Sequence, residues 1–133
     1  MLDPIEEIDV IQVTFLRALA SPRRLRIVHL LGERPREVNE IARDLGLGQA
    51  AVSAHLAAMR GVGLVEATRD GRSVRYRLVD PEVLTACNLM RDVIVRRLSA
   101  FGSLAAAATD GVADRAGAAP ATLAAHSYQV INR

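Results

Sequence analysis

The feature that most limits the fold of this chain is the short interval between two helical patterns in its middle. Apolar residues recur at helical spacing over residues 37–45 and again over residues 49–60. Only Gly46, Leu47 and Gly48 separate the two patterns, which is a tight turn with a glycine at each end. Two short helices joined by a three-residue turn that contains glycine form a helix-turn-helix. We therefore expect this motif at the centre of the fold.

Directly after the motif, the apolar period changes from helical spacing to alternation. Residues 64–69 and 72–79 each alternate as strands do, and Asp70-Gly71 between them is a hairpin turn signal. On the second strand, one face is apolar and consists of Val74, Tyr76 and Leu78. The opposite face is largely basic and consists of Ser73, Arg75 and Arg77. We expect a β-hairpin whose tip and outer face are basic.

Three further helices are predicted around these elements. One covers residues 4–20, one starts at Ser21-Pro22 and stops at Gly32, and a long one starts at Asp80-Pro81 and passes Leu98. The first and last carry apolar residues on more than one side, which is more than the core of a small monomer buries. We expect part of both helices to pack against something else, and the fold class to be mainly α with a β-hairpin.

The domain organisation follows from length and composition. With 133 residues, the chain fits one domain, which we place at residues 1–101. Residues 102–133 are rich in alanine and poor in large apolar groups, so we expect a disordered tail, although the alanine run 105–108 suits one more helical turn. No apolar run is long enough to cross a bilayer, and the first residues are acidic, so we expect a cytoplasmic protein with no membrane partner.

Charge is distributed unevenly along the chain. All 17 basic residues are arginine, and the formal net charge of the whole chain is only +2. Residues 21–78 hold eleven arginines and six acids, a net charge of +5, whereas residues 1–20 carry −3 and residues 79–133 are neutral. A basic middle between acidic or neutral ends is typical of a domain that meets a polyanion with its centre. Arginine is suited to phosphate because its guanidinium is a planar fork of donors.

From Leu16 to Leu98 the sequence resembles the ArsR/SmtB family of bacterial repressors. Three strings carry the resemblance: LRALASPRRLRIVHLL (16–31), EIARDLGLGQAAVSAHLAAMRGVGLV (40–65) and RDGRSVRYRL (69–78). The resemblance implies a winged helix-turn-helix that dimerises through its first and last helices. It also implies a sequence-specific transcriptional regulator, a repressor that binds double-stranded DNA at an inverted repeat and is released by an effector.

The family pattern also indicates which residues meet DNA. Four positions on the second helix of the motif face the major groove in the family, and here they hold Gln49, Ala50, Ser53 and Ala54, with His55 at the DNA edge. Gln49 and Ser53 can hydrogen-bond a base, whereas alanines can only touch thymine methyl groups, so direct readout is expected to be thin. Candidate phosphate or minor-groove contacts are Arg60, Arg69, Arg72, Arg75 and Arg77, with Arg23, Arg24 and Arg26 as further candidates.

Two departures from the family pattern matter. Gly48 stands where the family usually has Ser or Thr as the helix cap, a change that costs only a few tenths of a kcal/mol. At the positions of the family's arsenic ligands the chain has Glu37, Asn39 and Ala42, and none of these is a thiolate. At the positions of the zinc ligands the carboxylates Asp80 and Glu82 remain, but the partner side supplies Val93 and Arg96, an apolar group and a cation. We therefore expect no metal and no cofactor. The effector is not indicated by the sequence.

Two other classes of function are possible, and so is a particular mode of regulation for a repressor. A winged-helix module for protein–protein contact is favoured by the alanine-rich reading face and disfavoured by the arginines of the hairpin. A thiol-responsive repressor would use Cys87, the single cysteine, as its sensor, whereas the simpler interpretation is a small buried apolar residue. An enzyme is not expected, because we find no carboxylate pair, nucleophile–base pair or phosphate-binding loop.

Overall fold

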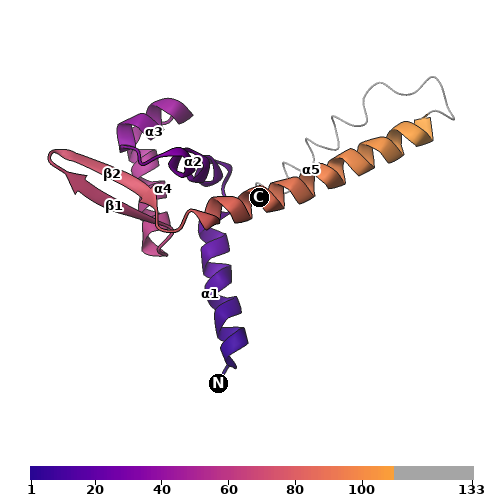
Figure 1. Ribbon diagram of the computed structural model, residues 1–133, viewed down its shortest axis with the longest axis horizontal. Helices are drawn as coiled ribbons and strands as arrows, with labels where there is room; N and C mark the ends of the chain where they lie inside the picture. The colour runs from indigo at the N-terminus through magenta and orange to yellow at the C-terminus, as the bar shows by residue number, and fades with distance from the viewer. Residues whose placement is uncertain (110–133) are drawn as a thin grey trace. The chain divides into compact units, whose positions relative to one another are not determined.

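The computed structural model describes residues 1–109, without the side chains of residues 105, 108 and 109. The chain divides into two compact units, Met1–Ala86 and the part from Cys87 onward. In chain order (Figure 1) the elements are α1 (Pro4–Leu19), α2 (Pro22–Glu33), α3 (Val38–Leu45), α4 (Gln49–Gly61), β1 (Val65–Asp70), β2 (Ser73–Leu78) and α5 (Glu82–Thr109). The predicted fold class, mainly α with a β-hairpin, is confirmed. Within the described residues no helix has the length and apolar character needed to span a membrane.

The first two helices both begin at a side-chain cap, and the sequence predicted the one on α2. The Asp3 carboxylate accepts from the backbone N–H groups of Ile5 and Glu6, each at 2.8 Å, and Glu6 accepts in return from the Asp3 N–H at 2.9 Å. Ser21 caps α2, with Pro22 at its first position. These caps satisfy the donors that a helix start leaves unpaired.

The core of the first unit lies between α2, α3, α4 and the base of the hairpin. Its fully buried large side chains come from all of these elements and are Ile27, Val28, Ile41, Val52, Leu56, Met59, Leu64 and Val65. The end of α2 also lies close to the first turn of α5, since a Cβ at Gly32 would be 2.2 Å from Leu84 Cδ2. This packing holds the helix-turn-helix and the hairpin in one unit.

The turn of the helix-turn-helix depends on its first glycine. Gly46 ends α3 with φ at +64°, a left-handed conformation that side-chain-bearing residues rarely adopt. The Leu47 N–H then donates to the Ala42 carbonyl at 3.0 Å, which closes the turn. Gly48 precedes α4 with an ordinary φ of −70° and supplies no side-chain cap. The helix-turn-helix predicted from the sequence is confirmed.

The hairpin is present, but its predicted turn is wrong by one residue. The strands are Val65–Asp70 and Ser73–Leu78, and Asp70 pairs with Ser73, so the two turn residues are Gly71 and Arg72 rather than Asp70 and Gly71. Only glycines have positive φ among the described residues, and Gly71 is one of them at +62°. A two-residue turn with glycine in its first position matches type II′, whereas type I′ needs positive φ at both positions. Asp70 therefore completes β1.

The last helix includes the alanine run 105–108, for which the sequence indicated one more helical turn. Asp80 Oδ1 accepts from the Glu82 N–H at 2.9 Å, and α5 runs from Glu82 to Thr109. The helix therefore continues past the boundary placed at residues 101 and 102, because the alanine-rich segment that follows has a high helix propensity. The rest of the predicted tail, residues 110–133, lies outside the described residues.

Candidate nucleic-acid interface

Helix α4 presents an exposed face of small and polar side chains. Val52, Leu56 and Met59 are fully buried, which confirms the predicted core side of this helix. The predicted base-contacting residues Gln49, Ala50, Ser53 and Ala54 are all exposed, as is Arg60 near the end of the helix. An α-helix with a narrow exposed face of this kind fits the width of the major groove.

His55 has a different environment from its neighbours on α4. It is half-buried, and its Nδ1 accepts a hydrogen bond from Arg24 Nε at 3.1 Å. Arg24 also donates to the Ala18 carbonyl at 3.3 Å, so this arginine links α4 to the end of α1. Burial first, and then the charges of Arg24 and Arg23, lower the pKa of His55. Arg24, a further candidate for phosphate contact, is thus engaged inside the protein, whereas Arg23 and Arg26 are exposed.

The arginines of the hairpin differ in their partners. Arg77 forms an ion pair with Glu66, which lies directly across from it on β1. Arg75 faces Thr68 in the ladder, and across residues 1–109 no ion pair is found for Arg69, Arg72 or Arg75. A shallow hollow on the hairpin is lined by Pro35, Thr68, Arg69, Asp70, Arg75 and Arg77. The unpaired guanidinium groups leave this surface suited to phosphate oxygens.

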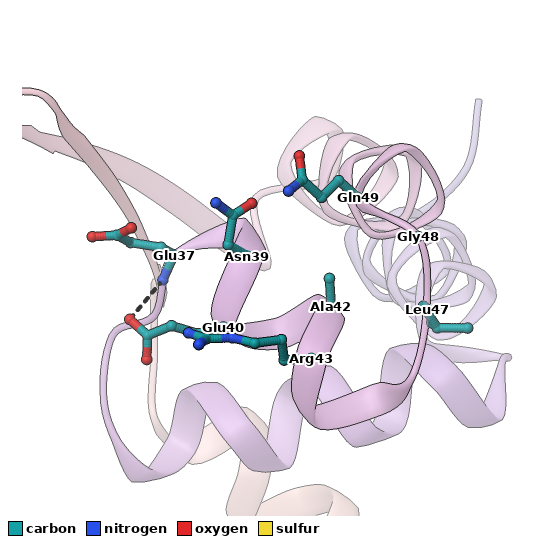
Figure 2. Close-up of a pocket in the computed structure, with 8 residues that line it drawn as sticks. All are labelled: Glu37, Asn39, Glu40, Ala42, Arg43, Leu47, Gly48 and Gln49. Atoms are coloured by element: carbon teal, nitrogen blue, oxygen red, sulfur yellow. Dashed lines mark hydrogen bonds between the residues drawn. The ribbon is translucent and has the colours of Figure 1, made fainter.

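A second open hollow lies between α3 and the start of α4 (Figure 2). It is lined by Glu37, Asn39, Glu40, Ala42, Arg43, Leu47, Gly48 and Gln49. Figure 2 shows the Asn39 and Gln49 side chains turned toward each other across this opening. From the sequence, Asn39 was expected only as the residue at a replaced metal-ligand position, and Arg43 was not predicted to belong to the site. An exposed amide and an exposed cation on the first helix of the motif were the signals available.

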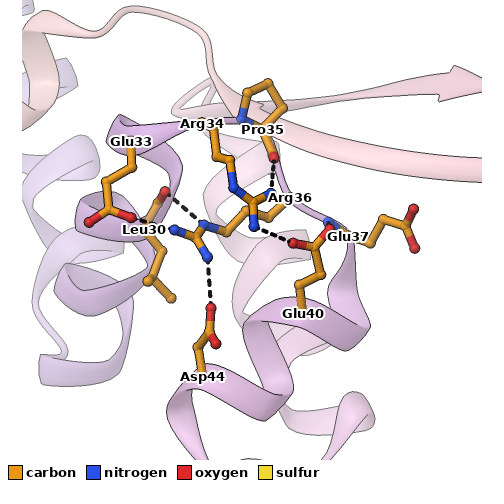
Figure 3. Close-up of polar contacts among 8 residues, drawn as sticks. All are labelled: Leu30, Glu33, Arg34, Pro35, Arg36, Glu37, Glu40 and Asp44. Carbon is orange, nitrogen blue, oxygen red and sulfur yellow. Dashed lines mark hydrogen bonds and ion pairs between the residues drawn. The ribbon is translucent and has the colours of Figure 1, made fainter.

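Beside this hollow, Arg36 is the one charged residue among the buried residues of the described chain, with 7% exposure (Figure 3). Its guanidinium donates to the Leu30 carbonyl at 3.0 Å and to Asp44 at 2.7 Å, and it also pairs with Glu33. The neighbouring Arg34 is exposed and pairs with Glu40 at 2.7 Å, and this hydrogen bond lowers the pKa of the Glu40 carboxyl. Arg36 was not singled out in the sequence, where residues 33–36 were expected to form a loop, and its partner Asp44 lies eight residues further on in α3.

Cys87 is half-buried in the last helix. Burial raises the pKa of its thiol, and the nearby charge of Arg91 opposes that shift. Among residues 1–109, no group of three or more His, Cys, Asp and Glu side chains is arranged to hold a metal ion.

Known proteins are similar to this chain both in sequence and in fold. The family model for bacterial regulatory proteins of the arsR family matches residues 21–67. The chain is 37% identical over 90 residues to the uncharacterized HTH-type transcriptional regulator Rv0081 of Mycobacterium tuberculosis, covering 67% of this chain and 79% of that protein. It is 42% identical over 79 residues to the HTH-type transcriptional regulator CmtR of Mycobacterium bovis, covering 59% of this chain and 67% of CmtR.

Among solved structures, the homodimeric winged helix-turn-helix DNA-binding domain of Mb0332 from Mycobacterium bovis, a possible ArsR-family transcriptional regulator, matches with a TM-score of 0.67. It is 33% identical and covers 74% of this chain and 91% of that one. Three helices, a recognition helix and a hairpin in this arrangement define a winged helix-turn-helix, with the hairpin as the wing. The chain belongs to the ArsR family and is a DNA-binding transcriptional regulator.

Proposed function

We propose that this regulator is a homodimeric repressor that binds an inverted-repeat operator, with α4 in the major groove and the wing along the flanking backbone. The observation that carries the proposal is the exposed, small-residue face of α4 on the same unit as a wing with unpaired arginines. A two-fold dimer presents two such surfaces, and a pseudo-palindromic site mirrors that symmetry. Such a regulator meets the bacterial chromosome in the cytoplasm.

Base readout is assigned to few groups. Gln49 can pair with adenine through its amide, and the Ser53 hydroxyl can donate to or accept from several bases. Ala50 and Ala54 can only contact thymine methyl groups, and Asn39 shares the hollow beside Gln49. His55 borders this surface while its Nδ1 remains bonded to Arg24. Most of the affinity therefore falls to phosphate contacts.

The phosphate contacts are assigned to arginines whose side chains have no ion pair or hydrogen bond within residues 1–109. These are Arg60 on α4 and Arg69, Arg72 and Arg75 on the wing. Arg77 is a weaker contact, because its ion pair with Glu66 already neutralises much of its charge. A wing arginine is also placed to enter a narrow minor groove at an A·T-rich flank.

The dimer interface is assigned to α1 and α5. Each helix, considered by itself, exposes large apolar side chains along its length: Ile5, Ile8, Val10, Ile11, Val13 and Leu16 on α1, and Leu89, Met90, Val93, Ile94, Leu98, Phe101 and Leu104 on α5. Many exposed large apolar side chains on one helix of a small protein mark a site of association with another molecule. The homodimer named for Mb0332 supports the same assembly here.

A salt titration of DNA binding tests this function. The affinity for an A·T-rich duplex is measured in mobility shifts at several salt concentrations, for the wild type and for Arg75→Ala and Arg77→Ala. Removing Arg75 should reduce the slope of log affinity against log salt by about 2 per dimer, since each phosphate contact contributes roughly 0.9. Arg77→Ala should reduce it less. A wild-type protein that binds no duplex would refute the function, and an unchanged slope in Arg75→Ala would move the phosphate contact elsewhere.

A further inference from the structure

Arg36 occupies the point where α2, α3 and the wing meet. Its guanidinium holds the Leu30 carbonyl and Glu33 at the end of α2 and Asp44 on α3 (Figure 3). The Arg36 side chain is 9% exposed, whereas its partners Glu33 and Asp44 are 67% and 44% exposed. A cation buried to this extent is tolerated because two carboxylates and a carbonyl replace its hydration.

The backbone of the same residue holds the wing. The Arg36 N–H donates to the Tyr76 carbonyl at 3.0 Å, and the Tyr76 N–H donates to the Arg36 carbonyl at 2.8 Å. Tyr76 is the middle of β2, and its other ladder partner is Ala67 on β1. The two residues that flank Tyr76 are Arg75 and Arg77, which point to the opposite, exposed side. The Arg36 side chain therefore fixes the segment to which the arginine-bearing strand is bonded.

Without the Arg36–Tyr76 bridge, the wing would be held at its base alone, where Leu64, Val65 and Leu78 are buried in the core. One further backbone bond, from the Val79 N–H to the Leu64 carbonyl at 3.1 Å, closes the hairpin below Tyr76. It restrains the base of the wing and leaves the middle of β2 tied only to β1. A wing that moves relative to α4 loses conformational entropy when both elements bind one duplex, which weakens binding. A wing that is already fixed avoids this loss.

We propose that Arg36 is a positioning residue for DNA binding: the ion pairs and hydrogen bond of its buried guanidinium hold the wing at the angle at which wing arginines and α4 engage one duplex together. This inference rests on the proposed function, since it assumes that the wing contacts phosphate. Arg36 itself touches no DNA in this arrangement, because its guanidinium is buried among Leu30, Glu33 and Asp44.

The test compares Arg36→Met with Arg34→Met. Each variant removes one positive charge, at positions two residues apart. Arg34, however, is exposed, and within the described part of the chain its guanidinium bonds to Glu40 and the neighbouring Pro35 carbonyl alone. Amide hydrogen exchange is measured at Tyr76, with the Val79 amide as the internal reference. Arg36→Met should accelerate exchange at Tyr76 at least about tenfold relative to Val79, and Arg34→Met should leave that ratio unchanged.

The salt slope of DNA binding supplies a readout that a general loss of stability does not move. A smaller folded fraction lowers affinity equally at all salt concentrations, whereas a displaced wing loses phosphate contacts and flattens the slope. Arg36→Met should flatten the slope at least as much as Arg75→Ala, although the removed charge is a buried one. Arg34→Met should retain the wild-type slope.

The outcomes distinguish a failure of the Arg36 proposal from a failure of the proposed wing contact with DNA. The inference is overturned if folded Arg36→Met exchanges the Tyr76 amide at the wild-type rate relative to Val79. It is also overturned if this variant retains the wild-type salt slope of DNA binding. An unchanged slope in Arg75→Ala refutes the wing contact instead, and then the exchange ratio alone decides whether Arg36 anchors the wing. If Arg36→Met does not fold, Asp44→Asn replaces it: a smaller acceleration at Tyr76 supports the anchor, and no acceleration overturns it.

Discussion

At the scale of single residues, His55 connects the recognition helix to the rest of the unit through a bond that needs a neutral imidazole. Its Nδ1 accepts from Arg24, and a ring nitrogen that accepts carries no proton. Burial and the charges of Arg24 and Arg23 lower its pKa below the ordinary 6.5. The neutral form is therefore the one that the folded protein favours.

Stability should consequently fall in mild acid. A histidine whose pKa is lower in the folded state contributes stability that is present above the unfolded pKa and is lost as the pH falls through the folded pKa. We expect the wild type to lose more unfolding free energy between about pH 7.5 and about pH 5.5 than His55→Gln, in which the amide oxygen still accepts from Arg24. Urea unfolding at both pH values measures this, and an equal loss in the two proteins would contradict it.

Cys87 should behave as a packing residue. Its thiol is half-buried and its pKa is raised, which disfavours the thiolate that reacts with oxidants. We expect Cys87→Ser to change DNA affinity by about twofold or less, and mild peroxide or polysulfide to leave the wild-type affinity unchanged. Mobility shifts with and without oxidant check this. Wild-type protein that releases DNA under oxidant, beside a serine variant that does not, would make Cys87 a sensor.

The individual roles of the arginines were the part that sequence patterns resolved least. Arg24, Arg36 and Arg77 all lie in the basic middle of the chain, and each is bonded inside the protein instead of being free. Their partners come from other elements, and contacts between elements leave no period in the sequence. Only the alternation along β2 indicated which arginines are exposed, and there it was right for Arg75 and Arg77.

At the scale of elements, substitutions at the two glycines of the helix-turn-helix should change the unfolding free energy in opposite directions. Gly46 has a φ of +64°, which costs a residue with a Cβ roughly 1–2 kcal/mol. Gly48 has ordinary backbone angles and open space around it, and a serine there can cap α4. We expect Gly46→Ala to lower the unfolding free energy by about 1–2 kcal/mol and Gly48→Ser to raise it by a few tenths.

Urea unfolding at one fixed protein concentration measures both changes. Gly61→Ala is a matched control, because its φ is not positive and no heavy atom lies within reach of an added Cβ. An alanine at position 46 that is tolerated as well as one at position 61 would show that the turn does not need the left-handed conformation.

The elements themselves were largely predictable, and their errors have local causes. The helices were found from caps and apolar spacing, and the start of α4 at Gln49 was placed correctly. The hairpin turn was displaced because Asp-Gly is a common turn pair, whereas the observed turn requires glycine in its first position. The domain boundary at residues 101 and 102 falls inside α5, although the alanine run 105–108 had indicated one more helical turn.

At the scale of the whole molecule, the exposed apolar side chains of α1 and α5 should be covered by a second copy. We expect Ile8→Glu and Val93→Glu each to weaken dimerisation at least about tenfold, because a charge would be placed in an apolar interface. Sedimentation over a range of protein concentrations measures the dissociation constant.

The control is Ser99→Glu, on the polar stripe of α5 that also holds Asp92, Arg96 and Ser103. This variant should remain as dimeric as the wild type. A wild type that sediments as a monomer with and without DNA would contradict the proposed assembly.

The surplus of apolar residues on these two helices was visible in the sequence, since no single small core can cover both. What the sequence did not indicate is the anchor between the wing and the helix-turn-helix. It joins Arg36 to Tyr76 across 40 residues of chain, and backbone hydrogen bonds carry no side-chain signature.

The small side chains on the exposed face of α4 have a consequence for how such a regulator works among many sites. Two hydrogen-bonding side chains per protomer offer modest discrimination, of about 1–3 kcal/mol for each good contact. In the proposed complex the wing arginines contact the phosphates of any duplex, and a chromosome offers on the order of a million or more competing positions. Occupancy of the operator is then set by the number of dimers in the cell as much as by the sequence they prefer, and a modest change in copy number alters which genes are regulated.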